Sequence, residues 1–221
     1  MYVAWGAFYE GESDRAYFEA LLPRLMEEIA LSEGNKPVTI PVAPAVQLGK
    51  KGREVRQVAT EICASSNAFH VVFVHADAGG RALEAGVDQR SVAYCQAAQA
   101  MCGWDPARCI VLKPRHETEA WVLADSGAVT AALGYSGSPR DLGLPNTPAA
   151  AERLVDPKLT LATAVEAAQG RKARRGGSQV FGTIAQTQSF ASLRGSRSFR
   201  EFETQVRAAR QSLGIIDPPS P

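Results

Sequence analysis

Residues 5–26, WGAFYEGESDRAYFEALLPRLM, predict a strand, a sharp turn and a helix in direct succession. The first residues of this stretch belong to an apolar and aromatic run over residues 2–9, which is typical of a buried strand. Gly11 permits the backbone angles of a tight turn, and Ser13 is suited to the N-cap of the helix that follows. Glu10 is therefore expected at the carboxyl end of a strand, the edge where open α/β sheets bind their ligands.

The helix is predicted from apolar residues that recur at steps of three and four along one face. These residues are Phe18, Leu21, Leu22, Leu25, Met26 and Ile29. Asp14 falls in the first turn, where a negative charge stabilises the helix dipole. Pro23 lies inside the pattern and predicts a kink or break there.

Three further strands and two further helices complete an α/β pattern. The strands are expected at residues 38–42, 69–74 and 109–113, and the helices at residues 54–65 and 81–102. The run FHVVFV at residues 69–74 is apolar throughout, which indicates a parallel strand covered on both faces. Alternating strands and helices predict a doubly wound, mainly parallel sheet of about four strands flanked by helices.

The second half of the chain has a different composition. Gly, Pro, Ser and Asn gather between residues 134 and 148, which is typical of a loop or linker. Helices are expected within residues 149–169, with an interruption near 156–158, and over residues 180–188 and 199–213. We therefore expect an α/β domain over residues 1–134 and, over residues 135–221, a linker and a helical C-terminal extension packed on it.

Overall composition excludes some classes of protein. The 221 residues carry a net charge of +1, so any anionic partner must be bound by local patches of charge. No apolar run approaches the roughly 20 residues of a membrane span, and the N-terminus has no signal-peptide pattern. The four cysteines, at positions 63, 95, 102 and 109, form no Cys-x-x-Cys pair. We expect reduced, partly buried thiols in a cytoplasmic protein with no membrane contact.

Acidic residues follow three of the predicted strands. Glu10 follows the first strand, Asp77 the third, and Glu117 and Glu119 the fourth. Carboxylates that converge repel one another unless a cation lies between them, and Mg²⁺ needs only two or three such ligands because it keeps several waters. Such an ion polarises phosphoryl oxygens and activates water, so the pattern predicts phosphate chemistry.

Two of these segments resemble known motifs. Residues 9–14, YEGESD, resemble the first motif of the Toprim superfamily, and residues 73–79, FVHADAG, resemble its second motif. The superfamily includes catalytic domains of primases, topoisomerases, small RNA-maturing nucleases and OLD-type nucleases. Residues 119–125, EAWVLAD, resemble a segment of small stand-alone bacterial Toprim-like proteins such as the RloB-like proteins, which often accompany ATPases in defence loci. The resemblance covers roughly the first 125 residues.

The resemblance implies roles for individual residues. Glu10 would act as general acid or base, and Asp77 would bind Mg²⁺ or Mn²⁺ and take part in catalysis. The family pattern is Asp-x-Asp, and here the second carboxylate is replaced by His75 or Gly79, depending on which position Asp77 occupies. Imidazole suits manganese better than magnesium. The remaining candidates are Glu117 and Glu119, which could complete the metal site, and Asp14, Gly11 and Asp125, which would support it.

Each of these residues also has a purely structural interpretation. Glu10 could be a solvated acid, Asp14 could serve only the helix dipole, and His75 could be a satisfied core histidine. Glu117 and Glu119 could favour the start of a helix capped by Thr118. For Asp125 and Trp121 the structural interpretation, with Trp121 as core packing, is the preferred one.

Ten basic residues are candidates for contacts with a nucleic-acid backbone. They are Lys50, Lys51, Arg53, Arg81, Lys113, Arg115, Arg171, Lys172, Arg174 and Arg175. A run of charge is usually a solvated face, but clustered positive charge in a nearly neutral protein suits phosphate backbones. No motif for reading bases in sequence is present, so sequence-specific recognition is not expected.

The leading hypothesis is a metal-dependent Toprim-like nuclease, which the resemblance places in phage defence or DNA processing. The alternative is a catalytically degenerate Toprim-fold protein that serves as a binding or regulatory subunit of an ATPase partner. A small phosphatase or nucleotide hydrolase is a third hypothesis. The chain is too short for a topoisomerase, and the sequence leaves open whether it forms a homodimer and whether it acts on DNA or RNA.

Overall fold

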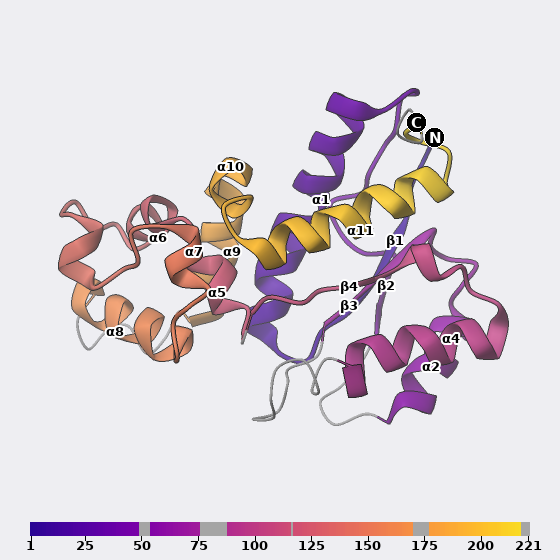
Figure 1. Ribbon diagram of the computed structural model, residues 1–221, viewed down its shortest axis with the longest axis horizontal. Helices are drawn as coiled ribbons and strands as arrows, with labels where there is room; N and C mark the ends of the chain where they lie inside the picture. The colour runs from indigo at the N-terminus through magenta and orange to yellow at the C-terminus, as the bar shows by residue number, and fades with distance from the viewer. Residues whose placement is uncertain (49–53, 76–87, 116, 170–176, 218–221) are drawn as a thin grey trace. The chain divides into compact units, whose positions relative to one another are not determined.

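The computed structural model describes residues 1–48, 54–75, 88–115, 117–169 and 177–217. Four strands form one sheet, β1 (Trp5–Phe8), β2 (Val46–Leu48), β3 (Val71–Val74) and β4 (Cys109–Val111). They lie in the order β2-β1-β3-β4, and every neighbouring pair is parallel. This confirms the predicted α/β class with a parallel, doubly wound sheet of four strands (Figure 1).

Helices account for most of the remaining described residues. In the first half they are α1 (Glu12–Glu33), α2 (Val55–Ala64), the π-helical turn η1 (Asp88–Val92), α4 (Ala93–Cys102) and the 3₁₀ turn η2 (Pro106–Arg108). In the second half they are α5 (Glu119–Val122), α6 (Ser126–Ala132), the 3₁₀ turn η3 (Pro139–Leu142), α7 (Pro148–Ala151), α8 (Pro157–Gln169), α9 (Gly177–Thr187), α10 (Phe190–Leu193) and α11 (Arg197–Ser212). No helix of the described residues is long and apolar enough to cross a membrane.

The chain forms two compact units that interleave in sequence. We call Met1–Gly11, Leu22–Leu112 and Phe202–Pro221 the sheet unit, and Glu12–Leu21 with Lys113–Glu201 the helical unit. The limits of the two units fall inside α1 and α11.

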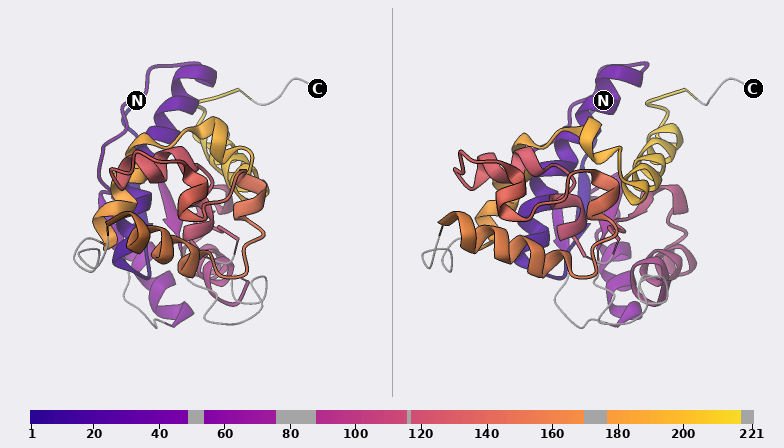
Figure 2. Two further views of the ribbon diagram at one scale, coloured as in Figure 1. Left: turned by 90° about the vertical axis from the view of Figure 1, so that its left-hand side faces the viewer. Right: turned by 60° about the vertical axis from the view of Figure 1, so that its left-hand side comes forward.

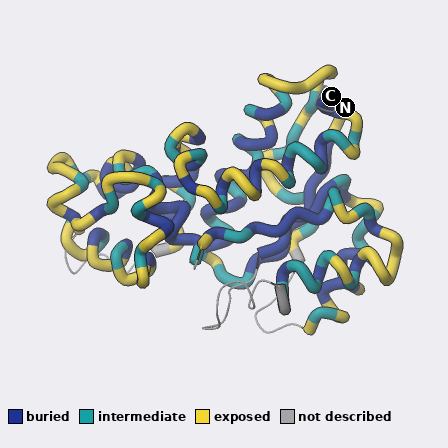
Figure 3. The backbone as a smooth tube through the Cα atoms, viewed as in Figure 1, coloured by how far each residue is buried: buried dark blue, intermediate teal, exposed yellow. Residues whose placement is uncertain are grey.

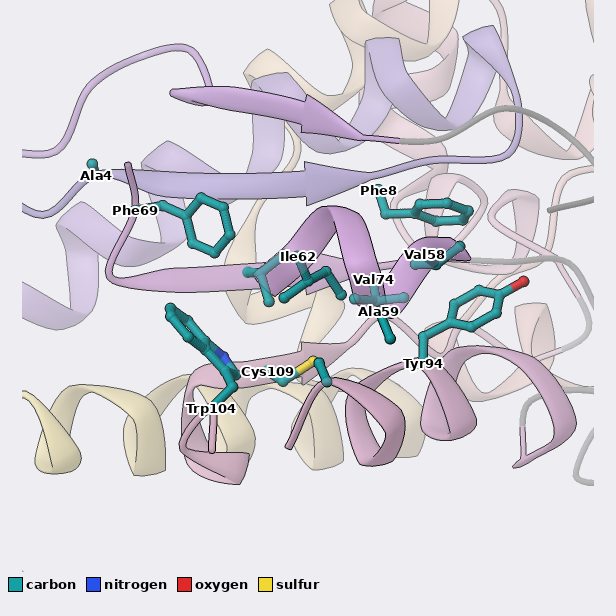
Figure 4. Close-up of a cluster of buried hydrophobic side chains, with 12 residues drawn as sticks. Ala4, Phe8, Val58, Ala59, Ile62, Phe69, Val74, Tyr94, Trp104 and Cys109 are labelled. Atoms are coloured by element: carbon teal, nitrogen blue, oxygen red, sulfur yellow. The ribbon is translucent and has the colours of Figure 1, made fainter. Parts of the chain in front are cut away.

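Both faces of the sheet are covered within the sheet unit, as the unbroken apolar run of β3 predicted. On one face Phe8, Val72 and Val74 pack with residues of α2 and α4 in a single buried cluster (Figure 4). On the other face the ring centroid of Phe73 lies 5.9 Å from Trp5 and 6.3 Å from Phe202 of α11. Figure 3 shows the resulting burial of β1, β3 and β4 in dark blue.

The second strand was predicted wrongly. The expected strand at residues 38–42 contributes only an isolated bridge from Thr39 to Tyr2, whereas the strand that pairs with β1 is Val46–Leu48. Pro37 and Pro41 flank Thr39 and have no N–H group, so they cannot donate to a strand ladder.

The first helix begins at Glu12 rather than after Ser13, where it was expected. It continues through Pro23, so the chain does not break there, and the kink that was the other expected outcome stays a prediction. Pro23 cannot donate to the carbonyl four residues earlier, but Leu21, Leu22 and Leu25 around it are fully buried. Burial of an apolar face supplies most of the stability of a helix in a protein, which outweighs one missing hydrogen bond.

The expectation of reduced thiols is wrong. Cys63 of α2 is joined to Cys102 at the end of α4, and Cys95 of α4 is joined to Cys109 at the start of β4. The partners are 39 and 14 residues apart, so only the packing of α2, α4 and β4 brings them together.

The outer edge of β4 is covered by a side chain. The amide of Gln205 on α11 accepts a hydrogen bond from the Val111 N–H (3.2 Å) and donates one to the Val111 carbonyl (3.5 Å). Gln205 thus takes the place of a neighbouring strand at an edge that would otherwise be open to pairing with another chain.

Trp121 is the centre of the helical unit, as the structural interpretation predicted. Its side chain is fully buried, with ring centroids 6.1 Å from Phe18 and 5.2 Å from Phe199. The buried Gln188 accepts a hydrogen bond from the Tyr17 hydroxyl (2.7 Å) and donates one to the Trp121 carbonyl (2.6 Å). Helices α6 to α9 of this unit can be followed in Figure 2 by their pink to orange colours.

Arg210 on α11 is a buried cation without a hydrogen-bonding partner among the described residues. Its side chain is 2% exposed, and Nε, Nη1 and Nη2 all lack an acceptor. The nearby Arg207 forms ion pairs with two acidic side chains, Glu33 at 2.8 Å and Glu203 at 3.1 Å. Burial lowers the pKa of Arg210 to about 10, and the negative charge of Glu33 opposes this only in part.

We therefore expect Arg210→Met to raise the free energy of unfolding at pH 7 by about 1–3 kcal/mol, because an apolar side chain of similar length removes an uncompensated charge. Urea denaturation measures the change. Arg207→Met on the same helix is the matched control and should lower stability, because it removes the ion-pair partner of two carboxylates. A loss of stability in Arg210→Met as large as in Arg207→Met would contradict this interpretation.

Candidate functional site

The carboxyl ends of β1 and β3 meet at one edge of the sheet unit. Phe8 pairs with Val74 in the parallel register, and the His75 N–H donates to the Phe8 carbonyl (2.9 Å). Glu10 and His75 therefore follow neighbouring strands at the same edge, as the sequence predicted. Asp77 lies outside the described residues.

Glu10 forms an ion pair that the sequence did not predict. Its carboxylate accepts a hydrogen bond from Nη1 of Arg90 at 2.8 Å, and the two side chains are 9% and 20% exposed. Burial acts to lower the pKa of Arg90, but the interactions with Glu10 and Tyr94 outweigh it and raise that pKa. Arg90 lies on the π-helical turn η1, eighty residues from Glu10, and nothing in its local sequence distinguishes it.

His75 is buried, with 3% of its surface exposed, and its Nδ1 lies 3.3 Å from the carbonyl oxygen of Leu112. Because a carbonyl oxygen only accepts, this contact is a hydrogen bond in the tautomer that carries the proton on Nδ1. In the neutral ring the lone pair is then on Nε2, which is the nitrogen that could bind a metal ion.

The other predicted acids lie in the helical unit. The buried carboxylate of Asp14 accepts a hydrogen bond from the Thr118 hydroxyl at 2.6 Å. Thr118 was expected to cap the following helix, but its side chain makes no such bond. The hydroxyl is instead used to satisfy a buried charge.

Glu119, the first residue of α5, is a buried acid of this unit. It is 8% exposed, and burial raises its pKa to about 7, with further increases from the negative charges of Glu117 and Asp14. A hydrogen bond from its own backbone N–H and the positive charge of Lys158 act in the opposite direction. A carboxyl group that titrates near neutral pH can both donate and accept a proton under physiological conditions, which is the property required of a general acid or base.

Asp125 and Gly11 were predicted to support the metal site. Asp125 caps α6 by accepting from the Ala128 N–H (3.1 Å), and its other oxygen accepts from the Ser189 N–H (3.0 Å). Gly11 is not among the glycines with positive φ in the described ranges.

Of the basic candidates, the structure describes only Lys113, which is half-buried, and Arg115, which is exposed. The remaining eight fall outside the described residues. They are Lys50, Lys51, Arg53, Arg81, Arg171, Lys172, Arg174 and Arg175. Their contacts with a nucleic acid stay a prediction.

The described part of the chain holds no group of three or more His, Cys, Asp or Glu side chains that could bind a metal ion. At the edge of β1 and β3 it places two residues whose side chains are of types that bind metal ions, Glu10 and His75. An ion bound there would need ligands from further residues or from water.

No protein-family model, curated protein or solved structure matches this chain. Its function must therefore be inferred from its own residues.

Proposed function

We propose that this chain is a metal-dependent Toprim-like nuclease that hydrolyses phosphodiester bonds in nucleic acid. The observation that carries the proposal is the placing of Glu10 and His75 after neighbouring strands of an all-parallel sheet. Ligands of open α/β sheets bind at this carboxyl edge. The fold class agrees with that of Toprim domains, which supports the proposal without testing the chemistry.

The residues have separate tasks in this proposal. Glu10 takes or gives the proton at the reacting oxygen. In the structure its carboxylate is paired with Arg90. Nε2 of His75, together with Asp77, would hold Mn²⁺ or Mg²⁺. The bound ion would polarise the phosphoryl group and lower the pKa of a water molecule.

The second candidate is a catalytically degenerate binding or regulatory subunit. It is favoured by the ion pair itself, because a carboxylate held 2.8 Å from a guanidinium is already neutralised. The second carboxylate of the Asp-x-Asp pattern is also missing from the sequence. Such a protein would bind its partner without turning over nucleic acid.

A cleavage assay separates the two candidates. Labelled single-stranded DNA, double-stranded DNA and RNA are incubated with the purified protein in magnesium, in manganese and in chelator. Cleavage that requires a divalent ion and is lost in Asp77→Asn is the expected result. No cleavage of any polymer, together with no divalent-ion binding by calorimetry, would reject the nuclease in favour of the binding subunit. Turnover of a nucleotide panel with all three polymers intact would instead indicate a nucleotide hydrolase.

A further inference from the structure

Helix α4 is attached covalently at both ends within the sheet unit. Cys95 in its first turn is joined to Cys109, the first residue of β4, and Cys102 at its end is joined to Cys63 of α2. Figure 1 shows α2 and α4 side by side. A ten-residue helix is thus held by two disulfides as well as by its packing.

The attached helix continues the turn that carries Arg90. Arg90 lies five residues before Cys95, and η1 runs into α4 without a gap. Between them, Tyr94 is 1% exposed and its ring centroid lies 5.3 Å from that of Phe8, the last residue of β1. The start of α4 therefore packs directly on the end of the strand that leads to Glu10, and Arg90 reaches across to the Glu10 carboxylate.

The two disulfides differ in access. Cys102 is exposed and Cys63 half-buried, whereas Cys95 is half-buried and Cys109 is 6% exposed. A small dithiol therefore reaches the Cys63–Cys102 bond first, because exchange requires a thiolate to approach a sulfur directly. Reduction at this bond leaves both thiols near an acceptor, since the Ala98 carbonyl oxygen lies 3.6 Å from Sγ of Cys63 and 3.1 Å from Sγ of Cys102.

We propose that the two disulfides form a redox-sensitive clamp that holds Arg90 against Glu10. In the oxidised protein the clamp fixes the start of α4 to β4 and so keeps the ion pair closed. Each disulfide is reduced by one molecule of a dithiol, which transfers two electrons and two protons and becomes a cyclic disulfide itself. The start of α4 is then no longer joined covalently to β4, and the ion pair opens more often.

Opening changes what Glu10 can bind. A divalent cation and a guanidinium repel each other, so a carboxylate released from Arg90 is a better ligand for the cation. The reduced protein is therefore the more active form, a consequence that rests on the proposed metal-dependent function. The clamp itself does not depend on that function.

Hydrogen exchange followed by mass spectrometry tests the clamp on the intact chain. Oxidised protein, protein reduced with dithiothreitol and the variant Cys95→Ser/Cys109→Ser are compared, and thiols are counted by alkylation. Amides of residues 90–98 should exchange on the order of tenfold faster in the reduced protein and in the variant, while those of β1 and β3 keep their rates. The matched variant Cys63→Ser/Cys102→Ser, which frees the far end of α4, should accelerate residues 90–98 less.

Two results would overturn the clamp. One is unchanged exchange of residues 90–98 in protein with four alkylated thiols. The other is equal acceleration in β1 and β3, which would mean general loosening rather than local release.

Calorimetric titration with Mn²⁺ tests the consequence separately. Affinity several-fold higher in the reduced protein supports it, and equal affinity in both forms rejects it. If neither form binds Mn²⁺, the metal-dependent function fails, and the exchange measurement still decides whether the clamp exists.

Discussion

Glu10→Gln is expected to lower the rate of metal-dependent strand cleavage by about a hundredfold or more. An amide cannot take up the proton of an attacking water, and it brings no negative charge to a cation, so the variant loses both properties proposed for Glu10. Single-turnover cleavage of a labelled strand in manganese measures the change. The comparison uses protein at saturating concentration, so that weaker binding is not mistaken for slower chemistry.

The same substitution also removes the ionic bond to Arg90, so it should cost about 1–2 kcal/mol of stability. Urea denaturation must therefore accompany the assay and show that the variant is folded at the assay temperature. Glu27→Gln, at an exposed position of α1, is the matched loss of one carboxylate and should retain wild-type cleavage. Cleavage by Glu10→Gln at the wild-type rate would eliminate Glu10 from the reaction.

Glu119→Gln should raise the free energy of unfolding by about 3 kcal/mol at pH 8. In the folded protein the carboxyl group of Glu119 has a pKa of about 7, against an ordinary value of 4.5. A tenfold difference in proton affinity corresponds to about 1.4 kcal/mol, which gives the expected size. Glutamine has nearly the same shape and cannot ionise, so it removes the cost of a buried negative charge.

The sign of the pH dependence follows from the same difference. Between pH 4.5 and pH 7 the folded protein holds a proton on Glu119 that the unfolded chain has released, so wild-type stability falls as pH rises through this window. Urea denaturation of both proteins in chelator, at several values from pH 4 to pH 8, should give curves that diverge as the pH rises. Glu166→Gln, exposed on α8, is a control that should follow the wild-type curve. Parallel curves for wild type and Glu119→Gln would refute the raised pKa.

Three of the four strands could be predicted from the sequence because each of them lies within an apolar run. The FHVVFV run contains β3 and predicted its burial on both faces, which Phe73 and Val74 confirm from opposite sides. The three-residue strand β2 could not be found in this way. It has no apolar run of its own, and its place is set by pairing with β1.

The candidate site was only partly predictable, for a related reason. Glu10 and His75 were found because each follows an apolar strand, and the parallel register then brings them to one edge. Arg90 could not be found, since an ion pair across eighty residues depends on how a π-helical turn packs against β1. The sequence contains Glu119, but the burial that raises its pKa arises only from the tertiary packing around it.

During synthesis, helix α11 is made well after the strands of the sheet that it covers. Phe202 covers the face of the sheet that carries Phe73, and Gln205 occupies the edge of β4, yet both follow Val111 by more than ninety residues. Ribosomes add roughly 5–20 residues per second, so the four strands exist for about 5–18 seconds before the helix that covers them has been made. Through that interval the nascent chain presents an apolar face and an unpaired strand edge to every neighbour. A chain ending at residue 134 would expose this apolar face and this strand edge permanently.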